Sequence, residues 1–126
     1  MLKVTLLGLG LFVGSLFAQD NLNKISSTTL GGYSASLSSQ NKIESNTTSP
    51  VLVSVYNKGK MLKAIDLNLT LYTPDNKTIE FKHIKSVDNQ YLANMKFSQN
   101  GEYKYVVKFS TQIGGVSHYL RGEFKI

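Results

Sequence analysis

The sequence predicts an all-β protein, an antiparallel β-sandwich of about seven strands preceded by a signal peptide. Three observations lead to this prediction. Apolar and polar residues alternate over most of the chain after position 31, which is the period of a strand with one buried face. Turn residues interrupt the alternation roughly every 8–12 residues. No segment has the 3.6-residue period of an amphipathic helix.

The N-terminal segment, residues 1–18, has the three parts of a secretory signal peptide: a positive start, an apolar run over 4–17 and the small residue Ala18. The run is shorter than the ~20 residues of a membrane-spanning helix. We therefore expect cleavage after Ala18. An uncleaved anchor is the alternative, because Leu16 occupies the −3 position of the cleavage site, where Ala is more usual. Residues 19–30 are polar and Ser/Thr-rich and are expected to form a flexible leader. The mature protein is expected in the periplasm or outside the cell, without a membrane span.

The remaining residues, 31–126, are expected to form one domain. Apolar and polar residues alternate most clearly over residues 64–72, and similar alternating segments precede and follow them. In each segment the apolar residues form a row that is expected to face inward. The predicted inward rows are Tyr33, Ala35 and Leu37; Val51, Val53 and Val55; Ile65, Leu67, Leu69 and Leu71; Ile79, Phe81 and His83; Tyr91, Ala93, Met95 and Phe97; Tyr103, Tyr105, Val107 and Phe109; and a last strand from about Ser117 to Ile126.

The segments between these rows have loop and turn composition. Residues 40–49 form a predicted polar loop that ends at Pro50, and the predicted turns lie at 57–60, 73–76, 86–89, 100–101 and 114–115. Tyr103 follows Gly101 by two residues, as in the tyrosine corner of immunoglobulin-like sandwiches, with an ordinary core tyrosine as the alternative. The spacing of strands and turns thus favours an immunoglobulin-like arrangement.

Composition excludes several classes of function. The chain of 126 residues has no cysteine, which excludes disulfides, thiolate metal sites and a cysteine nucleophile. Its formal net charge is +6, but the lysines are dispersed and form no block of the kind that binds nucleic acid. His83 and His118 lie in no nucleophile motif, and the carboxylates suggest no acid/base pair. We therefore expect a protein that is not an enzyme and does not bind nucleic acid.

Metal binding by this chain would depend on thioether and imidazole ligands, which suit copper better than zinc. Met61 follows a turn and His118 opens the last strand beside Gly115, so these two are the main candidates. His83 is a third candidate, with a rim histidine as the alternative. Met95 shares a row with Ala93 and Phe97 and is expected to pack in the core.

Two segments match an acidic-x-Asn-x-Thr acceptor for N-glycosylation. They are Glu44-Ser45-Asn46-Thr47-Thr48 and Asp66-Leu67-Asn68-Leu69-Thr70. Asn46 falls in the predicted polar loop, whereas Asn68 falls in a predicted strand. Only Asn46 is therefore expected to be accessible.

A family resemblance emerges from these segments taken together. The segments that carry the resemblance are Gly31-Gly32-Tyr33, the 50–55 strand, the 57–60 hairpin, the 64–71 strand and residues 100–103. In these segments the chain resembles the small exported immunoglobulin-like domains of the YtkA-like/FixH group, which includes secreted copper-resistance proteins. The resemblance covers residues 31–126. It implies a non-catalytic periplasmic accessory domain in copper or cation homeostasis, with a metal-efflux or oxidase-assembly component as partner. The family's methionine-rich loop is absent here, where the chain reads Thr73-Pro74, and so is its tryptophan.

A second function stays open beside metal handling. The sandwich would then be a protein-interaction module of the cell envelope, with no metal ligand, that presents a strand edge or loop to a partner protein. Partner binding that survives chelation and high salt would separate this function from metal handling.

Overall fold

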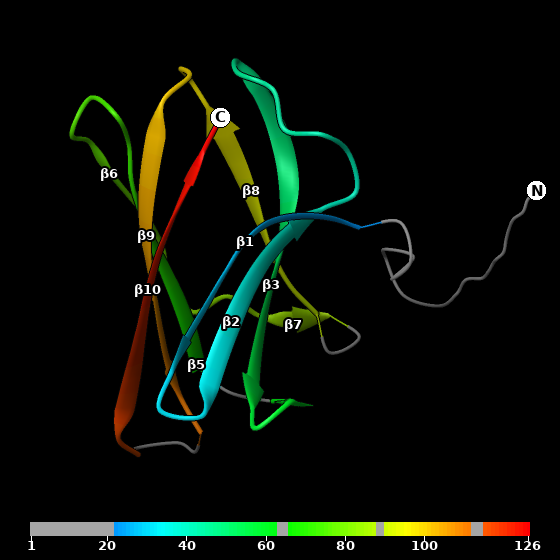
Figure 1. Ribbon diagram of the computed structural model, residues 1–126, viewed down its shortest axis with the longest axis vertical. Helices are drawn as coiled ribbons and strands as arrows, with labels where there is room; N and C mark the ends of the chain where they lie inside the picture. The colour runs from blue at the N-terminus through cyan, green and yellow to red at the C-terminus, as the bar shows by residue number, and fades with distance from the viewer. Residues whose placement is uncertain (1–21, 63–65, 88–89, 112–114) are drawn as a thin grey trace, which may run out of the picture.

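The computed structural model describes residues 22–62, 66–87, 90–111 and 115–126. These residues form ten β-strands in two antiparallel sheets that face each other, and they contain no helix (Figure 1). The predicted antiparallel β-sandwich is confirmed. The predicted signal peptide, Ile65 and Gly114 lie outside the described residues.

The two sheets have six and four strands. The first has the order β1 (Asn23–Leu30), β2 (Tyr33–Ser39), β3 (Thr47–Asn57), β8 (Gln90–Phe97) and β7 (Ser86–Val87), and β4 (Lys60–Met61) also pairs with β3. The second has the order β10 (Ser117–Lys125), β9 (Glu102–Ser110), β5 (Asp66–Tyr72) and β6 (Thr78–Phe81). The seven predicted strands correspond to β2, β3, β5, β6, β8, β9 and β10, and the structure adds β1, β4 and β7.

The core lies between the sheets and consists of most of the rows that the alternation predicts. The predicted inward row of β6 is wrong, because Ile79 is 37 % exposed and Phe81 is only partly buried. Strand β5 shows the pattern clearly, because Leu67, Leu69 and Leu71 are fully buried while Asp66 and Tyr72 are exposed. Met95 is buried in the same core, as predicted. The other buried core residues are Ala35, Leu37, Val51, Val53, Val55, Tyr91, Ala93, Phe97, Tyr103, Tyr105, Val107, Phe109, Leu120 and Phe124.

Tyr103 makes the contact of a tyrosine corner. Its ring is fully buried, and its hydroxyl donates a hydrogen bond to the Gln99 carbonyl over 2.7 Å, four residues back along the chain. The loop before β9 is closed by Gly101, which pairs with Ile126 through two backbone hydrogen bonds. Gly101 has φ of 140°, and a Cβ there would lie 2.9 Å from Pro74 Cγ. Only glycine fits this position without displacing the Pro74 turn.

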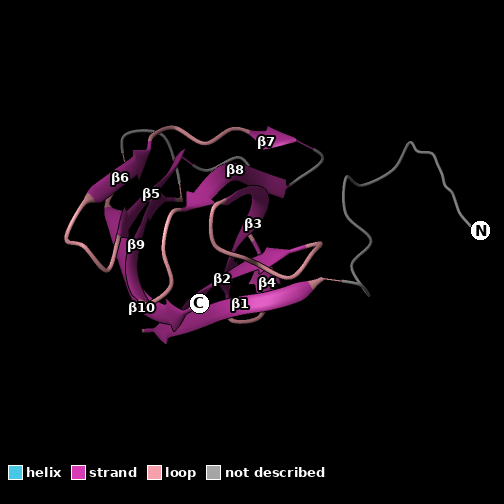
Figure 2. Ribbon diagram, turned by 90° about the horizontal axis from the view of Figure 1, so that it is seen from above, coloured by secondary structure: helices cyan, strands magenta, loops and turns pink. Residues whose placement is uncertain are grey.

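Strand β1 corrects the prediction of a flexible leader up to residue 30. Asn23–Leu30 pairs along its length with β2. Its other edge meets β10, where Ser26 Oγ donates to the Glu123 carbonyl over 3.1 Å and Thr28 Oγ1 to the Arg121 carbonyl over 2.6 Å. Figure 2 shows β1 and β10 side by side, so β1 joins the two sheets along one side. The Ser/Thr composition was misleading because these hydroxyls bind backbone carbonyls.

The start of β3 also differs from the prediction. The strand begins at Thr47, so the last three residues of the predicted polar loop belong to it, and Pro50 lies inside the strand opposite Asn94. Proline lacks an N–H donor and is tolerated where a strand has a free edge. The β2 ladder ends at the Ser39–Val51 pair, so β3 has no partner from β2 at Pro50.

Candidate functional site

The three metal ligands predicted from the sequence lie on different elements. Met61 ends β4, His118 is the second residue of β10, and His83 follows β6. All described His, Asp and Glu residues taken together form no group of three that could hold a metal ion. That result concerns imidazole and carboxylate ligands, so a site that includes Met61 stays a prediction.

His118 packs between aromatic rings. Its ring centroid lies 4.4 Å from that of Tyr33 and 5.3 Å from that of Phe109. Tyr33 belongs to the first sheet and Phe109 to the second, so the imidazole helps to join the sheets at the end where β9 finishes. This position gives His118 a packing role that the sequence did not indicate.

Met61 is open to solvent on the short strand β4. Its side chain is 36 % exposed, and it pairs with Tyr56 of β3. The strand exists because the preceding turn is a tight hairpin, with Lys58 at φ 51° and Gly59 at φ 84°. Two consecutive positive φ angles are those of a type I′ turn, which matches the twist of paired strands.

His83 has the most defined polar environment of the three. The sequence placed it in the row of Ile79 and Phe81, but β6 ends at Phe81 and the His83 side chain is 75 % exposed. Its φ is 51°, a left-handed conformation that is uncommon for a residue with a side chain. Its backbone N–H donates to Asn68 Oδ1 over 2.6 Å, and its Nδ1 lies 3.0 Å from Asp66 Oδ1.

Asp66 and Asn68 are the residues that sequence reasoning missed. Both occupy outward positions of β5, and they hold the backbone and the ring of a residue some fifteen positions further along. In the sequence these two residues are visible only as the polar positions of the alternation in β5. That pattern does not indicate that the chain after β6 returns to the outer face of β5. The contact depends on the antiparallel pairing of β5 with β6.

The His83–Asp66 pair has the chemistry of a metal contact with few protein ligands. In the tautomer that carries its proton on Nδ1, His83 donates to the carboxylate and keeps the Nε2 lone pair for a metal, an arrangement common around metal-bound histidines. Imidazole nitrogen is also a ligand that suits Cu(II). The exposed position leaves further coordination sites to water or to a partner.

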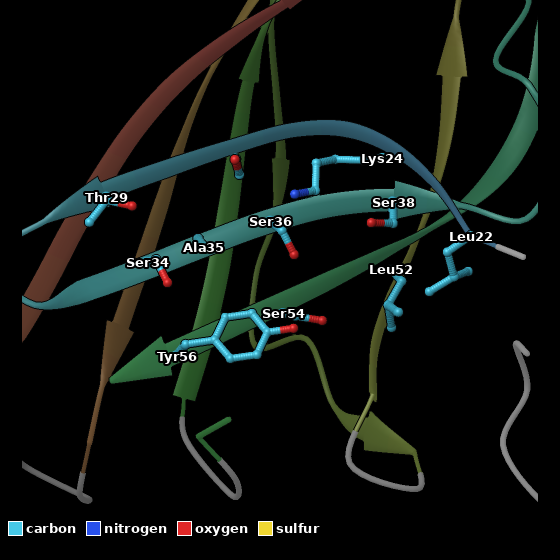
Figure 3. A pocket seen from close by; sticks show the side chains of 11 residues that line it. Leu22, Lys24, Thr29, Ser34, Ala35, Ser36, Ser38, Leu52, Ser54 and Tyr56 are labelled. Carbon is cyan, nitrogen blue, oxygen red and sulfur yellow. The ribbon is translucent and has the colours of Figure 1, made fainter. Parts of the chain in front are cut away.

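A separate groove lies on the outer face of the first sheet (Figure 3). Its volume is about 470 Å³, and hydroxyl-bearing side chains predominate in its lining. It is lined by Leu22, Lys24, Ser27, Thr29, Ser34, Ala35, Ser36, Ser38, Leu52, Ser54 and Tyr56.

The groove residues stand in register across three strands. Ser27 of β1, Ser36 of β2 and Ser54 of β3 form one cross-strand row. Ser38 and Ser54 are only 9 % and 7 % exposed, and neither hydroxyl has a hydrogen-bond partner among the described residues. Such hydroxyls can donate hydrogen bonds to, and accept them from, a polar ligand or water. Lys24 is the one charged side chain among the described residues that line the groove.

Comparison with known proteins identifies a structural likeness without a sequence relative. No protein family and no curated protein matches the chain. A solved structure of a copper-bound variant of FetP from uropathogenic Escherichia coli strain F11 is similar, with a TM-score of 0.56 and 10 % identity over 83 % of this chain and 95 % of that one. At this identity the likeness shows the fold alone. The resemblance to the YtkA-like/FixH group therefore stays a prediction.

The part of the chain that the structure describes contains no helix long and apolar enough to cross a membrane.

Proposed function

We propose that this protein is a non-catalytic accessory protein of the periplasm or cell exterior that takes part in copper handling, and that His83 and Asp66 form its copper contact. The observation that carries the proposal is the 3.0 Å contact between His83 Nδ1 and Asp66 Oδ1 on an exposed surface. The likeness to a sandwich whose solved form holds copper supports the same function. The resemblance to exported copper-resistance domains supports it independently.

The geometry favours a site that binds copper weakly and releases it again. Asn68 fixes the backbone of His83, and Asp66 orients its ring, so the imidazole is held in place before a metal arrives. The single imidazole ligand leaves most of the coordination sphere of Cu(II) to water or a partner protein, and Asp66 acts by orienting that imidazole. Such a site suits transfer of the ion to an efflux or oxidase-assembly component rather than storage.

A Cu(II) titration of the purified protein tests this proposal. The chain has seven tyrosines and no tryptophan, so quenching of tyrosine fluorescence reports binding, and electron paramagnetic resonance reports the nitrogen and oxygen ligands. His83→Ala should abolish specific binding. Asp66→Asn should weaken it about 10- to 100-fold, the usual effect of losing a carboxylate behind a metal-bound histidine.

His118→Ala and Met61→Ala are the matched controls, because they remove the other two predicted ligands. Both variants should bind Cu(II) as the wild type does. Binding that persists in His83→Ala and disappears in His118→Ala or Met61→Ala would overturn the assignment of the site to His83. Absence of binding in the wild type with either Cu(I) or Cu(II) would overturn copper handling itself.

The hydroxyl-lined groove favours a second candidate function, an interaction module of the cell envelope without a metal ligand. Its buried, unpaired Ser38 and Ser54 hydroxyls would bind polar groups of a partner protein. A photo-crosslinking residue at Ser36 should then capture one partner even after chelation, and Ser54→Val should weaken that capture. Crosslinking lost on chelation would favour the copper function instead.

A further inference from the structure

We propose that Asn46 is a site of N-linked glycosylation, which accepts an oligosaccharide from a polyprenyl-diphosphate donor. The segment Glu44-Ser45-Asn46-Thr47-Thr48 has the hydroxyl residue two positions after the asparagine that N-glycosylation requires, and an acidic residue two positions before it. The motif alone is not decisive, because the chain contains the Asn-x-Thr pattern three times. The structure distinguishes among the three.

Asn46 occupies the accessible position that such a transfer needs. It lies at the turn between the loop after β2 and the first residue of β3, and its side chain is exposed. Its φ is 64°, which directs the chain around the turn. Its carboxamide has no hydrogen-bond partner among the described residues, so both amide hydrogens are available.

The neighbouring residues hold the turn without covering it. The Asn46 backbone N–H donates to the Phe97 carbonyl of β8, and Thr47 Oγ1 donates to the Glu44 carbonyl over 2.6 Å. Glu44 and Thr48, the two recognition positions, are both exposed. The acidic, amide and hydroxyl groups of the acceptor segment can therefore all reach a transferase.

Asn68 matches the same pattern but is held inside a sheet. It lies in β5 opposite Lys108 of β9, and its Oδ1 accepts the His83 backbone N–H over 2.6 Å. Asn76 also precedes a threonine by two positions, at Thr78, but Pro74 stands where the acidic residue would be. The folded protein therefore offers one complete and accessible acceptor.

The reaction is a group transfer without oxidation or reduction. Asn46 Nδ2 forms a bond to the anomeric carbon of the first sugar, and the bond from that carbon to the diphosphate oxygen breaks. The polyprenyl diphosphate leaves with the electron pair, and the amide proton passes to a base of the oligosaccharyltransferase. The acceptor protein supplies only the asparagine and its two recognition residues.

The position of Asn46 is compatible with the proposed copper contact. The Asn46 N–H binds the Phe97 carbonyl, and the Phe97 ring meets Tyr103 near the start of β9. Asp66 instead pairs with Ser110, the last residue of β9. The extended segment from Tyr103 to Ser110 spans roughly 25 Å. A glycan on Asn46 should leave Cu(II) binding unchanged.

In vitro glycosylation of the purified, folded protein tests the proposal independently of export. The assay uses a single-subunit bacterial oligosaccharyltransferase and a polyprenyl-diphosphate-linked oligosaccharide, with intact-mass spectrometry as the readout. One glycan per chain should be added, and Asn46→Gln, Thr48→Ala and Glu44→Ala should each abolish or strongly reduce the addition. Asn68→Gln and Asn76→Gln should leave it unchanged.

The unfolded chain provides a control for the role of structure. Peptides from the digested protein that contain each segment should be modified at both Asn46 and Asn68, because the sheet no longer protects Asn68. A folded protein that receives no glycan while a known acceptor peptide is modified in the same reaction would overturn the proposal. Modification of the folded protein at Asn68 or Asn76 in place of Asn46 would overturn it equally.

Discussion

Gly122 and Tyr105 show how single residues set the packing of the second sheet. The two face each other across β9 and β10, and a Cβ on Gly122 would come within 3.0 Å of three atoms of the Tyr105 ring and hydroxyl. The ring passes over the glycine, and its hydroxyl makes a 2.8 Å hydrogen bond with Ser26 Oγ of β1. The absence of a side chain at Gly122 therefore allows Tyr105 to link three strands.

We expect Gly122→Ala to destabilise the protein by about 1–3 kcal/mol, the usual cost of forcing an extra carbon into a packed site. The methyl group must displace the Tyr105 ring and with it the hydrogen bond to Ser26. Urea unfolding followed by circular dichroism measures the loss. In a Tyr105→Ala background the same substitution should cost much less, and an equal cost there would show that the ring is not the cause.

Tyr105 should also make stability depend on pH in the alkaline range. Burial raises the pKa of its phenol above the ordinary 10.0, although the Ser26 hydrogen bond opposes the shift. Below about pH 10 the phenol is neutral in both the folded and the unfolded protein, so its titration does not change the free energy of unfolding. Above it, the unfolded chain loses the proton first, so the free energy of unfolding falls as pH rises toward the folded-state pKa.

Urea unfolding of the wild type and Tyr105→Phe from pH 7 to pH 11 measures this dependence. Their difference in unfolding free energy should be constant below about pH 9 and should shift in favour of the variant above about pH 10. Lysine titration affects both proteins alike and cancels in the difference. Parallel curves throughout would contradict an altered Tyr105 pKa.

At the scale of the element, β1 shows that a strand can be held by hydroxyls where it buries little apolar surface. Only Ile25 of this strand packs against the core, whereas Ser26 and Thr28 donate to carbonyls of β10. These bonds cover the free edge of β10, which would otherwise be open to pairing with another chain.

Thr28→Val should destabilise the protein by about 1 kcal/mol, because it replaces the hydroxyl with a methyl group of similar size and leaves the Arg121 carbonyl without its donor. Thr29→Val is the matched control, since Thr29 is exposed and lines the outer groove. Amide hydrogen exchange should be faster across β1 in Thr28→Val only. Equal effects of the two variants would contradict the role of the β1–β10 contact.

At the scale of the whole molecule, one aromatic cluster joins the two sheets. Phe97 of the first sheet meets Tyr103 and Phe124 of the second edge-on, at centroid distances of 5.4 and 5.9 Å. Tyr103 and Phe124 stack on each other at 5.4 Å. Without disulfides, such contacts and the aliphatic rows between the sheets must hold the sandwich together.

Phe97→Ala should lower the free energy of unfolding by about 3–5 kcal/mol, because it opens a cavity between the sheets. The tyrosine fluorescence and circular dichroism transitions should still coincide, since both sheets share one core and unfold together. Separate transitions in the wild type would show that the sheets are independent units.

The sequence by itself was sufficient for seven of the ten described strands and for most of their inward rows. Each depends on local chemistry: the two-residue period of buried side chains, and turn residues such as Gly59 that accept positive φ. Alternation along one strand is visible without knowledge of its neighbours. Leu67, Leu69, Leu71 and Met95 are therefore buried as predicted.

Only the tertiary structure decided what depends on contacts between distant segments. Strand β1 exists because β2 and β10 accept its hydrogen bonds, and its composition alone resembles a leader. His118 is packed between Tyr33 and Phe109, and His83 meets Asp66, because the sheets bring together residues far apart in the chain. Alternation reports which face a residue occupies, whereas a binding site depends on which other strands present their residues to that face.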